Sequence, residues 1–174
     1  MFRLTKSPRL SEFEREVLPH LDAAYNLARF FMRNDQDAED VVQEASLRAF
    51  RFFENFRGGN SRAWFLKIVR NASFTALKKN RAEEMNIDFD EELHSTDASA
   101  MNPGVAIDQA QNRQTVRTAI EQLPPEFREV ITLRELEGAS YKEIADVAGV
   151  PIGTVMSRLA RARRQLQMIL SKSK

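Results

Sequence analysis

Basic and aromatic side chains alternate in one segment of the chain, a mixture that suits single-stranded nucleic acid. The aromatic members of this segment are Phe52, Phe53, Phe56, Trp64 and Phe65, and the basic members are Arg51, Arg57, Arg62, Lys67 and Arg70. Basic side chains bind the phosphate backbone, and exposed aromatic rings stack on unpaired bases. The Gly58-Gly59-Asn60 loop has little side-chain bulk, so backbone and amide groups there could hold a base that has left its stack. The alternative is that the rings, which recur at helical spacing, fill a core.

A second candidate site lies near the C-terminal end, where a short turn separates two predicted helices. Ser140 and Glu143 have the spacing of a capping box, which predicts a helix start at residue 141. Gly149 can adopt the left-handed conformation that ends such a helix, and a new helical pattern begins at Gly153. A helix, a short glycine-containing turn and a second helix together indicate a helix-turn-helix motif.

The second helix of this motif divides into an apolar face and a basic face. At 100° per residue, its apolar face consists of Val155, Leu159, Ala162 and Leu166. The opposite face carries Met156, Ser157, Ala160, Arg161 and Arg164. A helix in the major groove presents its N-terminal residues to base edges and its arginines to bases or phosphates. The motif therefore predicts binding to duplex DNA; the alternative is a helical hairpin with a solvated basic face.

Start and stop residues divide the rest of the chain into helices. Ser11 and Glu14 form a capping-box pattern that predicts a helix start at Ser11, and Pro19 predicts a kink or break near Leu18. The predicted caps of the next two helices are Asp35 or Asp37 and Ser61. Further helices are expected at residues 105–123, 126–137, 141–148 and 153–170.

The helical pattern stops from about residue 83 to residue 103, where Ser, Asp, Asn, Pro and Gly accumulate. No alternation typical of strands competes with the helices. We therefore predict an all-α fold with two small helical domains, residues 1–84 and 108–174, joined by a flexible acidic linker at residues 85–107.

The charges are arranged in blocks that the total conceals. The chain has 174 residues with 26 Lys and Arg against 25 Asp and Glu, a net charge of +1 that by itself argues against a nucleic-acid partner. The blocks carry −5 at residues 35–44, +6 at residues 51–80, −7 at residues 81–110 and +6 at residues 158–174. Each domain thus has its own basic surface, and we expect the free chain to bind DNA weakly and with strong salt dependence.

Several function classes find no support in the residue types. The chain has no cysteine, so it has neither a disulfide framework nor a cysteine-based zinc site, which fits the cytoplasm. His20 and His94 are isolated, and we predict no metal, no cofactor and no small-molecule substrate. Without a P-loop, a dinucleotide glycine pattern or a cysteine nucleophile, an enzyme is not expected. No apolar run is long enough for direct membrane insertion.

Three stretches of the chain, considered together, resemble a known family. DAEDVVQEASLRAFRFF, FRGGNSRAWFLKIVRN and LPPEFREVITLRELEGASYKEIADVAGVPIGTVMSRLARARRQL are similar to regions 2 and 4 of bacterial sigma factors. More narrowly, they resemble the extracytoplasmic-function group, which keeps only those two regions. The resemblance implies an alternative sigma factor that binds core RNA polymerase, recognises the −35 and −10 promoter elements, promotes strand opening and initiates transcription. It also implies an anti-sigma factor as inhibitor, which in some members sequesters the protein at the inner membrane face.

The resemblance assigns roles to matching positions. Core polymerase contacts fall on Asp37, Glu39, Asp40, Gln43, Glu44 and Arg48. Contacts with the −10 element fall on Phe56, Arg57, Gly58, Gly59, Asn60, Ser61, Arg62, Trp64, Lys67, Arg70 and Asn71. Contacts with the −35 element fall on Thr154, Met156, Ser157, Arg158, Ala160, Arg161, Arg163 and Arg164. The family often has a basic residue in place of Met156 and a larger one in place of Ala160, so the −35 sequence does not follow.

Two other functions remain as alternatives. A sigma-like decoy would bind an anti-sigma factor and never DNA, but it need not retain the arginines of the second helix. A stand-alone helix-turn-helix repressor would leave the N-terminal half unexplained. Geometry favours a chain that contacts both promoter elements, since about 20 extended residues reach roughly 65 Å and one and a half turns of duplex span roughly 50 Å.

Overall fold

Every element of the computed structural model is helical in the residues that it describes, 7–86 and 106–172, which confirms the all-α prediction. The helices of the N-terminal half are α1 (Pro8–Val17), η1 (Leu18–His20), α2 (Leu21–Met32), α3 (Asp35–Arg51), η2 (Phe53–Asn55) and α4 (Ser61–Asn86). Those of the C-terminal half are α5 (Ala106–Glu121), α6 (Pro125–Ile131), η3 (Thr132–Leu136), α7 (Tyr141–Ala148) and α8 (Ile152–Lys172). The predicted flexible linker lies outside the described residues except at its two ends. The domain boundaries at residues 84 and 108 stay predictions.

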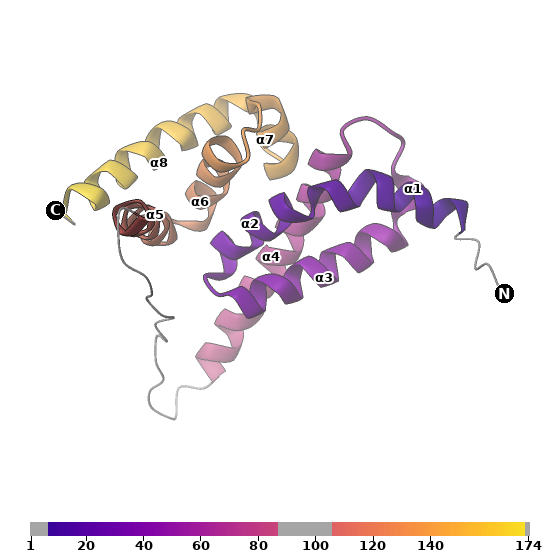
Figure 1. Cartoon of the computed structure of the whole chain (residues 1–174), viewed down its shortest axis with the longest axis horizontal. Coiled ribbons are helices and arrows are strands. Elements are labelled where there is room, and N and C mark those ends of the chain that lie inside the picture. Colours follow the sequence, from indigo (N-terminus) through magenta and orange to yellow (C-terminus); the bar gives the residue numbers. More distant parts are fainter. Residues whose placement is uncertain (1–6, 87–105, 173–174) are drawn as a thin grey trace.

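The N-terminal lobe, α1 to α4, is built around three helices that pack against one another (Figure 1). Alanines such as Ala24 and Ala45 are fully buried where α2, α3 and α4 meet, so the helices approach closely. Larger apolar side chains, including Leu27, Phe31 and Phe65, fill the space between them. Because these residues repeat at helical spacing, the sequence directs one face of each helix inward.

The helix starts in this lobe differ from the predicted ones. α1 begins at Pro8, whose fixed φ angle suits a first helical position, and Ser11 lies one turn inside the helix. α3 is capped by Asn34, whose Oδ1 accepts from the Asp37 N–H at 2.7 Å, so Asp35 and Asp37 are not the caps. The predicted break at Pro19 is confirmed, since α1 ends at Val17 and a 3₁₀ turn follows.

The capping residue of α4 also differs from the predicted one. Asn60, not Ser61, is the capping residue, because its Oδ1 accepts from the Ala63 N–H at 2.9 Å. In both helices a neighbouring asparagine replaces the predicted Ser or Asp. Asparagine is as good a cap as either of them, so the sequence pattern does not choose between adjacent candidates.

The C-terminal lobe contains the predicted helix-turn-helix in α7 and α8. Both bonds of the Ser140–Glu143 capping box are present, and Gly149 ends α7 with a φ angle of 66°. On α8, Val155, Leu159 and Ala162 are buried against α6 and α7, as the helical spacing predicted. The expected single helix at residues 126–137 is instead α6 followed by a π-helical turn, η3.

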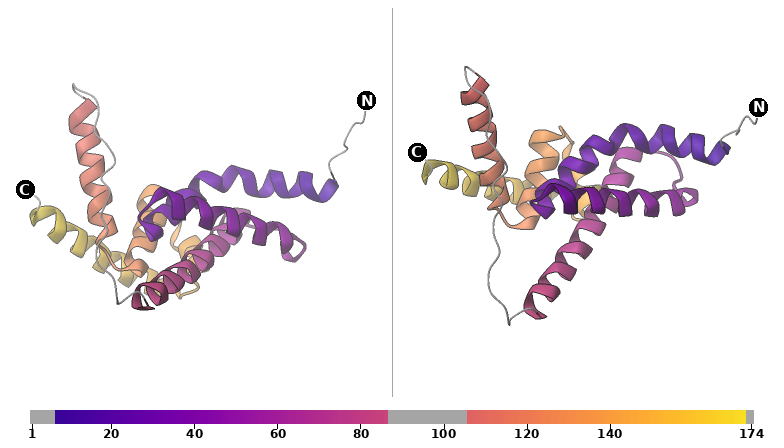
Figure 2. Two further views of the ribbon diagram at one scale, coloured as in Figure 1. Left: turned by 90° about the horizontal axis from the view of Figure 1, so that it is seen from below. Right: turned by 60° about the horizontal axis from the view of Figure 1, so that its bottom comes forward.

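The two lobes pack against each other in this structure. α7 lies against α4, and α6 lies against α2 (Figure 1). Figure 2 shows α5 and the end of α4 projecting from the body of the molecule. Within the described ranges, the helices are too short or too polar to cross a bilayer.

The capping box yields a first prediction. Ser140→Ala is expected to lower the free energy of unfolding by about 0.5–2 kcal/mol, because it removes the acceptor for an N–H in the first turn of α7. Ser11→Ala, inside α1 and exposed, is expected to change it by less than about 0.5 kcal/mol. Urea unfolding followed by circular dichroism measures both, and equal losses in the two variants would contradict these cap assignments.

Candidate nucleic-acid interface

The glycine loop before α4 has a backbone that only glycine adopts readily. Gly58 and Gly59 have φ angles of +84° and +96°, and a Cβ at either position would meet nothing within 4 Å. Glycine is therefore required by the turn and not by crowding. The loop is exposed, so its backbone groups are open to a ligand.

Most of the aromatic side chains around this loop pack against one another. Phe56 lies 5.2 Å from the Trp64 ring and 5.9 Å from the Phe53 ring, measured between centroids. Phe53 and Phe65 are buried, as expected from the alternative in which these rings fill a core. Phe52 is 51 % exposed, while Phe56 and Trp64 are half-buried with one side of the cluster at the surface. The cluster fixes the loop and offers a small number of accessible ring faces.

Three of the predicted −10 residues are engaged by the other lobe. Asn60 Nδ2 donates to Glu143 Oε1 at 2.8 Å. Arg62 Nη2 donates to the Glu137 carbonyl oxygen at 2.6 Å and lies 3.3 Å from Glu137 Oε2. Arg70 Nε donates to Glu129 Oε1 at 2.6 Å. Arg57, Lys67 and Asn71 are exposed, whereas Ser61 is half-buried, its Oγ 3.3 Å from His20 Nε2.

Residues that sequence analysis did not single out make the most buried polar contacts between the lobes. The Glu129 side chain is 0 % exposed, and burial raises its pKa against the opposing influence of Arg70. Arg128 Nη1 donates to the Phe30 and Phe31 carbonyl oxygens at 2.8 and 3.2 Å, and burial lowers its pKa to about 10. Both residues lie in the helix predicted at residues 126–137, and its spacing gave no indication of their partners.

The capping glutamate of α7 also belongs to this interface. The Ser140 N–H bond and the Asn60 amide bond hold the pKa of Glu143 below its ordinary value. Glu143 therefore stays ionised while it caps α7 with one oxygen and contacts the loop before α4 with the other.

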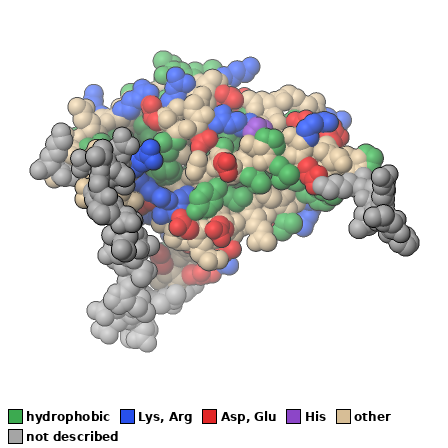
Figure 3. Space-filling view, in the orientation of Figure 1, with side chains coloured by type: hydrophobic (Ala, Val, Ile, Leu, Met, Phe, Trp, Pro, Cys, Tyr) green, Lys and Arg blue, Asp and Glu red, His purple; other side chains and the backbone are tan. Residues whose placement is uncertain are grey.

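The recognition face of α8 is exposed as its helical spacing predicted. Met156 is 54 % exposed, and Ser157, Ala160, Arg161 and Arg164 lie on the same open side. Lys and Arg side chains gather along the upper edge of the face shown in Figure 3, over α7 and α8. This surface is free of the other lobe and is accessible to duplex DNA.

Three further predicted −35 residues, Thr154, Arg158 and Arg163, are half-buried or paired within the lobe. Thr154 is half-buried, and its carbonyl oxygen accepts from Ser157 Oγ at 3.0 Å. Arg163 pairs with Glu135 of η3 at 2.6 Å. Arg158 is half-buried, with a buried Nη1 that has no hydrogen-bond partner in the described residues. The structure thus separates the outward Arg161 and Arg164 from Arg163, which is exposed but paired with Glu135, and from the half-buried Arg158.

Four of the six predicted polymerase-binding residues line a groove between α3 and α4. The groove has a volume of about 430 Å³, and Val41 and Ala76 contribute to its apolar floor. Its rim carries the charged side chains of Asp37, Asp40, Glu44, Arg48 and Lys79. Glu39 and Gln43 are exposed on α3 but do not line it. An apolar floor with an acidic rim fits a helical protein partner with basic residues.

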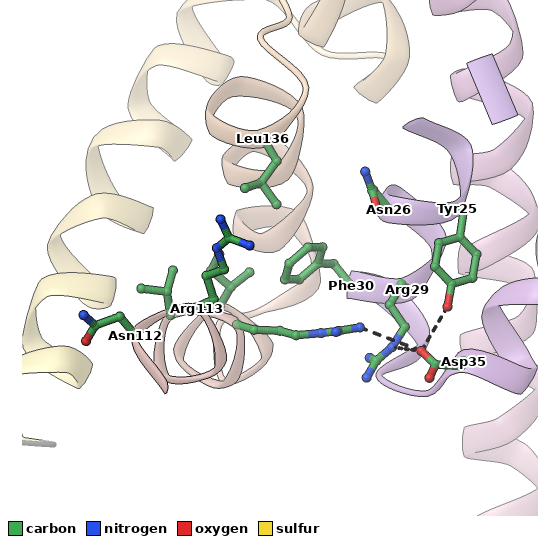
Figure 4. Close-up of a pocket in the computed structure, with 11 residues that line it drawn as sticks. Tyr25, Asn26, Arg29, Phe30, Asp35, Asn112, Arg113 and Leu136 are labelled. Atoms are coloured by element: carbon green, nitrogen blue, oxygen red, sulfur yellow. Dashed lines mark hydrogen bonds and ion pairs between the residues drawn. The ribbon is translucent and has the colours of Figure 1, made fainter. Parts of the chain in front are cut away.

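A larger groove, about 850 Å³, lies between the lobes (Figure 4). Asp35 accepts from Arg29 Nε at 2.6 Å and from Tyr25 Oη at 3.0 Å, and these two bonds lower its pKa. On the opposite wall, Val116 of α5 and Leu136 of η3 present apolar side chains, and Leu136 is 50 % exposed. The groove combines an apolar surface with arginines at its edge.

Two family models match the sequence, one in each lobe. Residues 17–83 match the family model "Sigma-70 region 2", and residues 113–166 match "Sigma-70, region 4". The extracytoplasmic-function (ECF) RNA polymerase sigma factor SigE of Mycolicibacterium smegmatis is 33 % identical over 94 % of this chain, which spans only 63 % of that relative. The RNA polymerase sigma-H factor of Pseudomonas aeruginosa is 34 % identical over 91 % of this chain and 86 % of the relative. The ECF sigma-E factor of Escherichia coli K12 is 36 % identical over 75 % of this chain and 72 % of the relative.

Solved structures resemble the whole chain, both lobes included. The sigma factor RpoE of Bartonella quintana, in complex with the anti-sigma factor NepR, has a TM-score of 0.73 and 29 % identity over 94 % of this chain and 99 % of its own. CnrH, in complex with the cytosolic domain of CnrY, has a TM-score of 0.67 and 26 % identity over 95 % of this chain and 91 % of its own. From the two matched regions and the relatives above 30 % identity, the chain belongs to the extracytoplasmic-function RNA polymerase sigma factors, transcription initiation factors with no catalytic activity of their own.

Proposed function

We propose that this sigma factor reads the −35 element with the outward face of α8 and the −10 element with the loop and first turns of α4. The observation that carries the proposal is the open basic face of α8, which places Arg161 and Arg164 beside the short side chains of Ser157 and Ala160. Short side chains let the helix backbone approach the bases, and the arginines then reach base edges or phosphates. Arg163, paired with Glu135, and the half-buried Arg158 are less free to contact DNA.

Core RNA polymerase binds, in this proposal, at the groove between α3 and α4. Asp37, Asp40 and Glu44 form its acidic rim, and the −5 block to which they belong would repel DNA. A positively charged helical segment of the polymerase satisfies both the rim and the apolar floor. The acidic surface therefore faces the enzyme while the basic surfaces face the promoter.

An anti-sigma factor is the inhibitor we propose for this chain. Two sigma factors that resemble it over both lobes were solved with such inhibitors bound. The groove between the lobes offers Leu136 and Val116 as apolar contacts and Arg113 at its edge. An amphipathic helix with acidic residues matches that chemistry.

The test of the promoter proposal is to map transcript starts. Purified chain is added to sigma-free core polymerase with fragmented genomic DNA of the source bacterium, and the transcript ends are sequenced. We expect a set of starts that share two upstream elements at a constant spacing. Starts identical to those of core polymerase alone would overturn the proposal.

The salt dependence of binding gives a prediction for α4. Lys67 is exposed on the face next to the glycine loop, where it can neutralise one phosphate. Lys67→Ala is expected to reduce the slope of log affinity against log salt by about 0.7 for a single strand carrying the mapped −10 sequence. Fluorescence anisotropy at several salt concentrations measures the slope. Lys172→Ala, far along α8, is the charge-matched control and is expected to leave it unchanged; equal effects would argue against a −10 role for Lys67.

A further inference from the structure

His20 contacts the start of the proposed −10 surface from a different part of the N-terminal lobe. Its Nε2 lies 3.3 Å from Ser61 Oγ, although the two residues are 41 positions apart in the sequence. Both side chains are half-buried. The contact joins two helical elements of the same lobe, so it does not depend on the other lobe. The surfaces proposed above for DNA, polymerase and inhibitor do not include His20.

The break at Pro19 brings His20 to this position. Helix α1 ends at Val17, and the 3₁₀ turn η1 leads from it into α2. His20 is the residue that precedes α2, yet its side chain makes no capping bond to that helix. The ring is therefore available to α4, against which α1 and α2 both pack.

Ser61 connects His20 to the glycine loop. Its backbone N–H donates to the Gly59 carbonyl oxygen at 3.1 Å, and Gly59 has a φ angle of +96°. Asn60, which lies between these two residues, caps α4 by accepting from the Ala63 N–H. A hydrogen bond at Ser61 Oγ thus restrains the same short segment that turns the chain into α4.

Restraint is important in this loop because it contains two adjacent glycines. Glycine loses more backbone freedom on ordering than any other residue. Gly58 and Gly59 are exposed, and a Cβ at either would meet nothing within 4 Å, so neighbouring atoms restrain them little. A loop that becomes ordered only when DNA binds loses affinity, whereas a loop already held in the bound shape avoids that loss.

His20 is uncharged at neutral pH. Burial and, next in size, the neighbouring Arg62 of α4 lower its pKa below the ordinary value, while Glu16 of α1 opposes them. A neutral imidazole has one donor and one acceptor nitrogen, so it forms a hydrogen bond with the Ser61 hydroxyl. It does not attract a phosphate as a lysine or arginine does.

We propose that His20 is a positioning residue for −10 recognition, whose hydrogen bond with Ser61 holds the glycine loop in the shape that receives the −10 strand. His20 itself does not contact the DNA. The inference rests on the −10 assignment proposed above, and it adds to that assignment a residue from outside the loop and α4.

Two substitutions at His20 separate the effect of the hydrogen bond from that of the ring. His20→Gln keeps a polar atom near the place of Nε2 and loses the ring, whereas His20→Phe keeps a ring and loses the bond. Holoenzyme assembled from each variant and core polymerase is titrated with a fluorescent single strand carrying the mapped −10 sequence, and core polymerase alone gives the background.

We expect the His20→Phe holoenzyme to bind the −10 strand about threefold to tenfold more weakly than the unmodified one, the effect of one hydrogen bond. The His20→Gln holoenzyme is expected to bind within about twofold of the unmodified one. Full affinity with Phe and reduced affinity with Gln would overturn the proposal, because the ring would then contact the DNA directly. Full affinity with both would overturn it as well.

A double-mutant cycle tests whether His20 acts through Ser61. Ser61→Ala removes the other half of the hydrogen bond. We expect His20→Phe to weaken binding no further when Ser61→Ala is already present, since both changes break the same contact. An equal loss from His20→Phe with and without Ser61 would overturn the proposal, because His20 would then act through a different contact.

The −35 duplex and the salt dependence separate positioning from unfolding and from phosphate contact. We expect the His20→Phe holoenzyme to bind the mapped −35 duplex as tightly as the unmodified one. At neutral pH its slope of log affinity for the −10 strand against log salt should also be unchanged, because a neutral residue releases no counterion. Equal weakening at both elements, or a smaller slope, would overturn the proposal.

Leu18→Ala is the matched control, since it changes an exposed side chain in the same 3₁₀ turn. We expect it to leave binding of the −10 strand unchanged, and a loss equal to that of His20→Phe would overturn the proposal. Circular dichroism checks that each variant is folded. If His20→Phe does not fold, His20→Leu takes its place in the cycle and in the salt and −35 measurements, under the same rules.

Failure of the −10 assignment has a different signature from failure of this inference. If the assignment fails, Lys67→Ala leaves the salt slope for the −10 strand unchanged. If only the inference fails, Lys67→Ala still reduces that slope, while the His20 variants contradict one of the expectations above.

Discussion

Changing Arg161 and Arg164 together to alanine is expected to weaken binding to a −35 duplex by at least about 30-fold. Each arginine that reaches a base edge or phosphate contributes about 1–3 kcal/mol, and the two lie on the same open face of α8. Neither supports the fold, because the buried residues of this helix are Val155, Leu159 and Ala162. Binding is measured by anisotropy with the mapped promoter duplex.

The matched control for this variant removes two arginines elsewhere. Arg15 on α1 and Arg113 on α5 are both exposed, so changing both to alanine alters the net charge equally. We expect this control to bind the −35 duplex within about threefold of the unmodified chain, since screened distant charges contribute little. Equal weakening in both variants would mean that α8 attracts DNA only through the overall charge.

Phe65→Ala is expected to lower the free energy of unfolding by about 3–5 kcal/mol. The Phe65 ring is 0 % exposed in the core of the N-terminal lobe, and its loss leaves a cavity that neighbouring helices fill only in part. Much of the stability of a small domain would be lost. Urea unfolding measures the change, and the neighbouring Trp64 is a convenient fluorescent reporter because it is the only tryptophan in the chain.

Phe52→Ala is the control for the core variant. Phe52 is 51 % exposed although it occupies a position that the helical spacing assigned to the core. We expect its removal to change the free energy of unfolding by less than about 1 kcal/mol. A large loss at Phe52 with little loss at Phe65 would contradict the observed packing of the lobe.

Helical spacing predicted the fold and the recognition helix well. Val155, Leu159 and Ala162 lie inward and Arg161 outward, because the period of an α-helix fixes which residues share a face. The Ser140 capping box and the turn at Gly149 were equally predictable, since both depend on local geometry. Family and function followed from these local patterns in combination.

Contacts between the lobes were not predictable from such patterns. Glu129 and Arg128 lie among other charged residues of the predicted helix, and nothing local identifies their partners, which are 59 residues away for Glu129 and 97 or 98 residues away for Arg128. The charge blocks likewise suggested that basic and acidic segments act separately, whereas Arg70 is paired with a glutamate of the other lobe. Long-range pairing depends on how the domains pack, and that information is absent from the helical period.

Run-off transcription from one mapped promoter is the most direct test of the central claim that this chain directs core polymerase to a two-element promoter. The purified chain, core polymerase and three templates are used: the intact promoter, one with a scrambled −10 element and one with a scrambled −35 element. We predict a transcript from the intact template alone, and only when the chain is present. Equal transcript from all three templates would contradict the claim. So would the absence of any transcript from a chain that still binds an anti-sigma factor, which is the behaviour of a decoy.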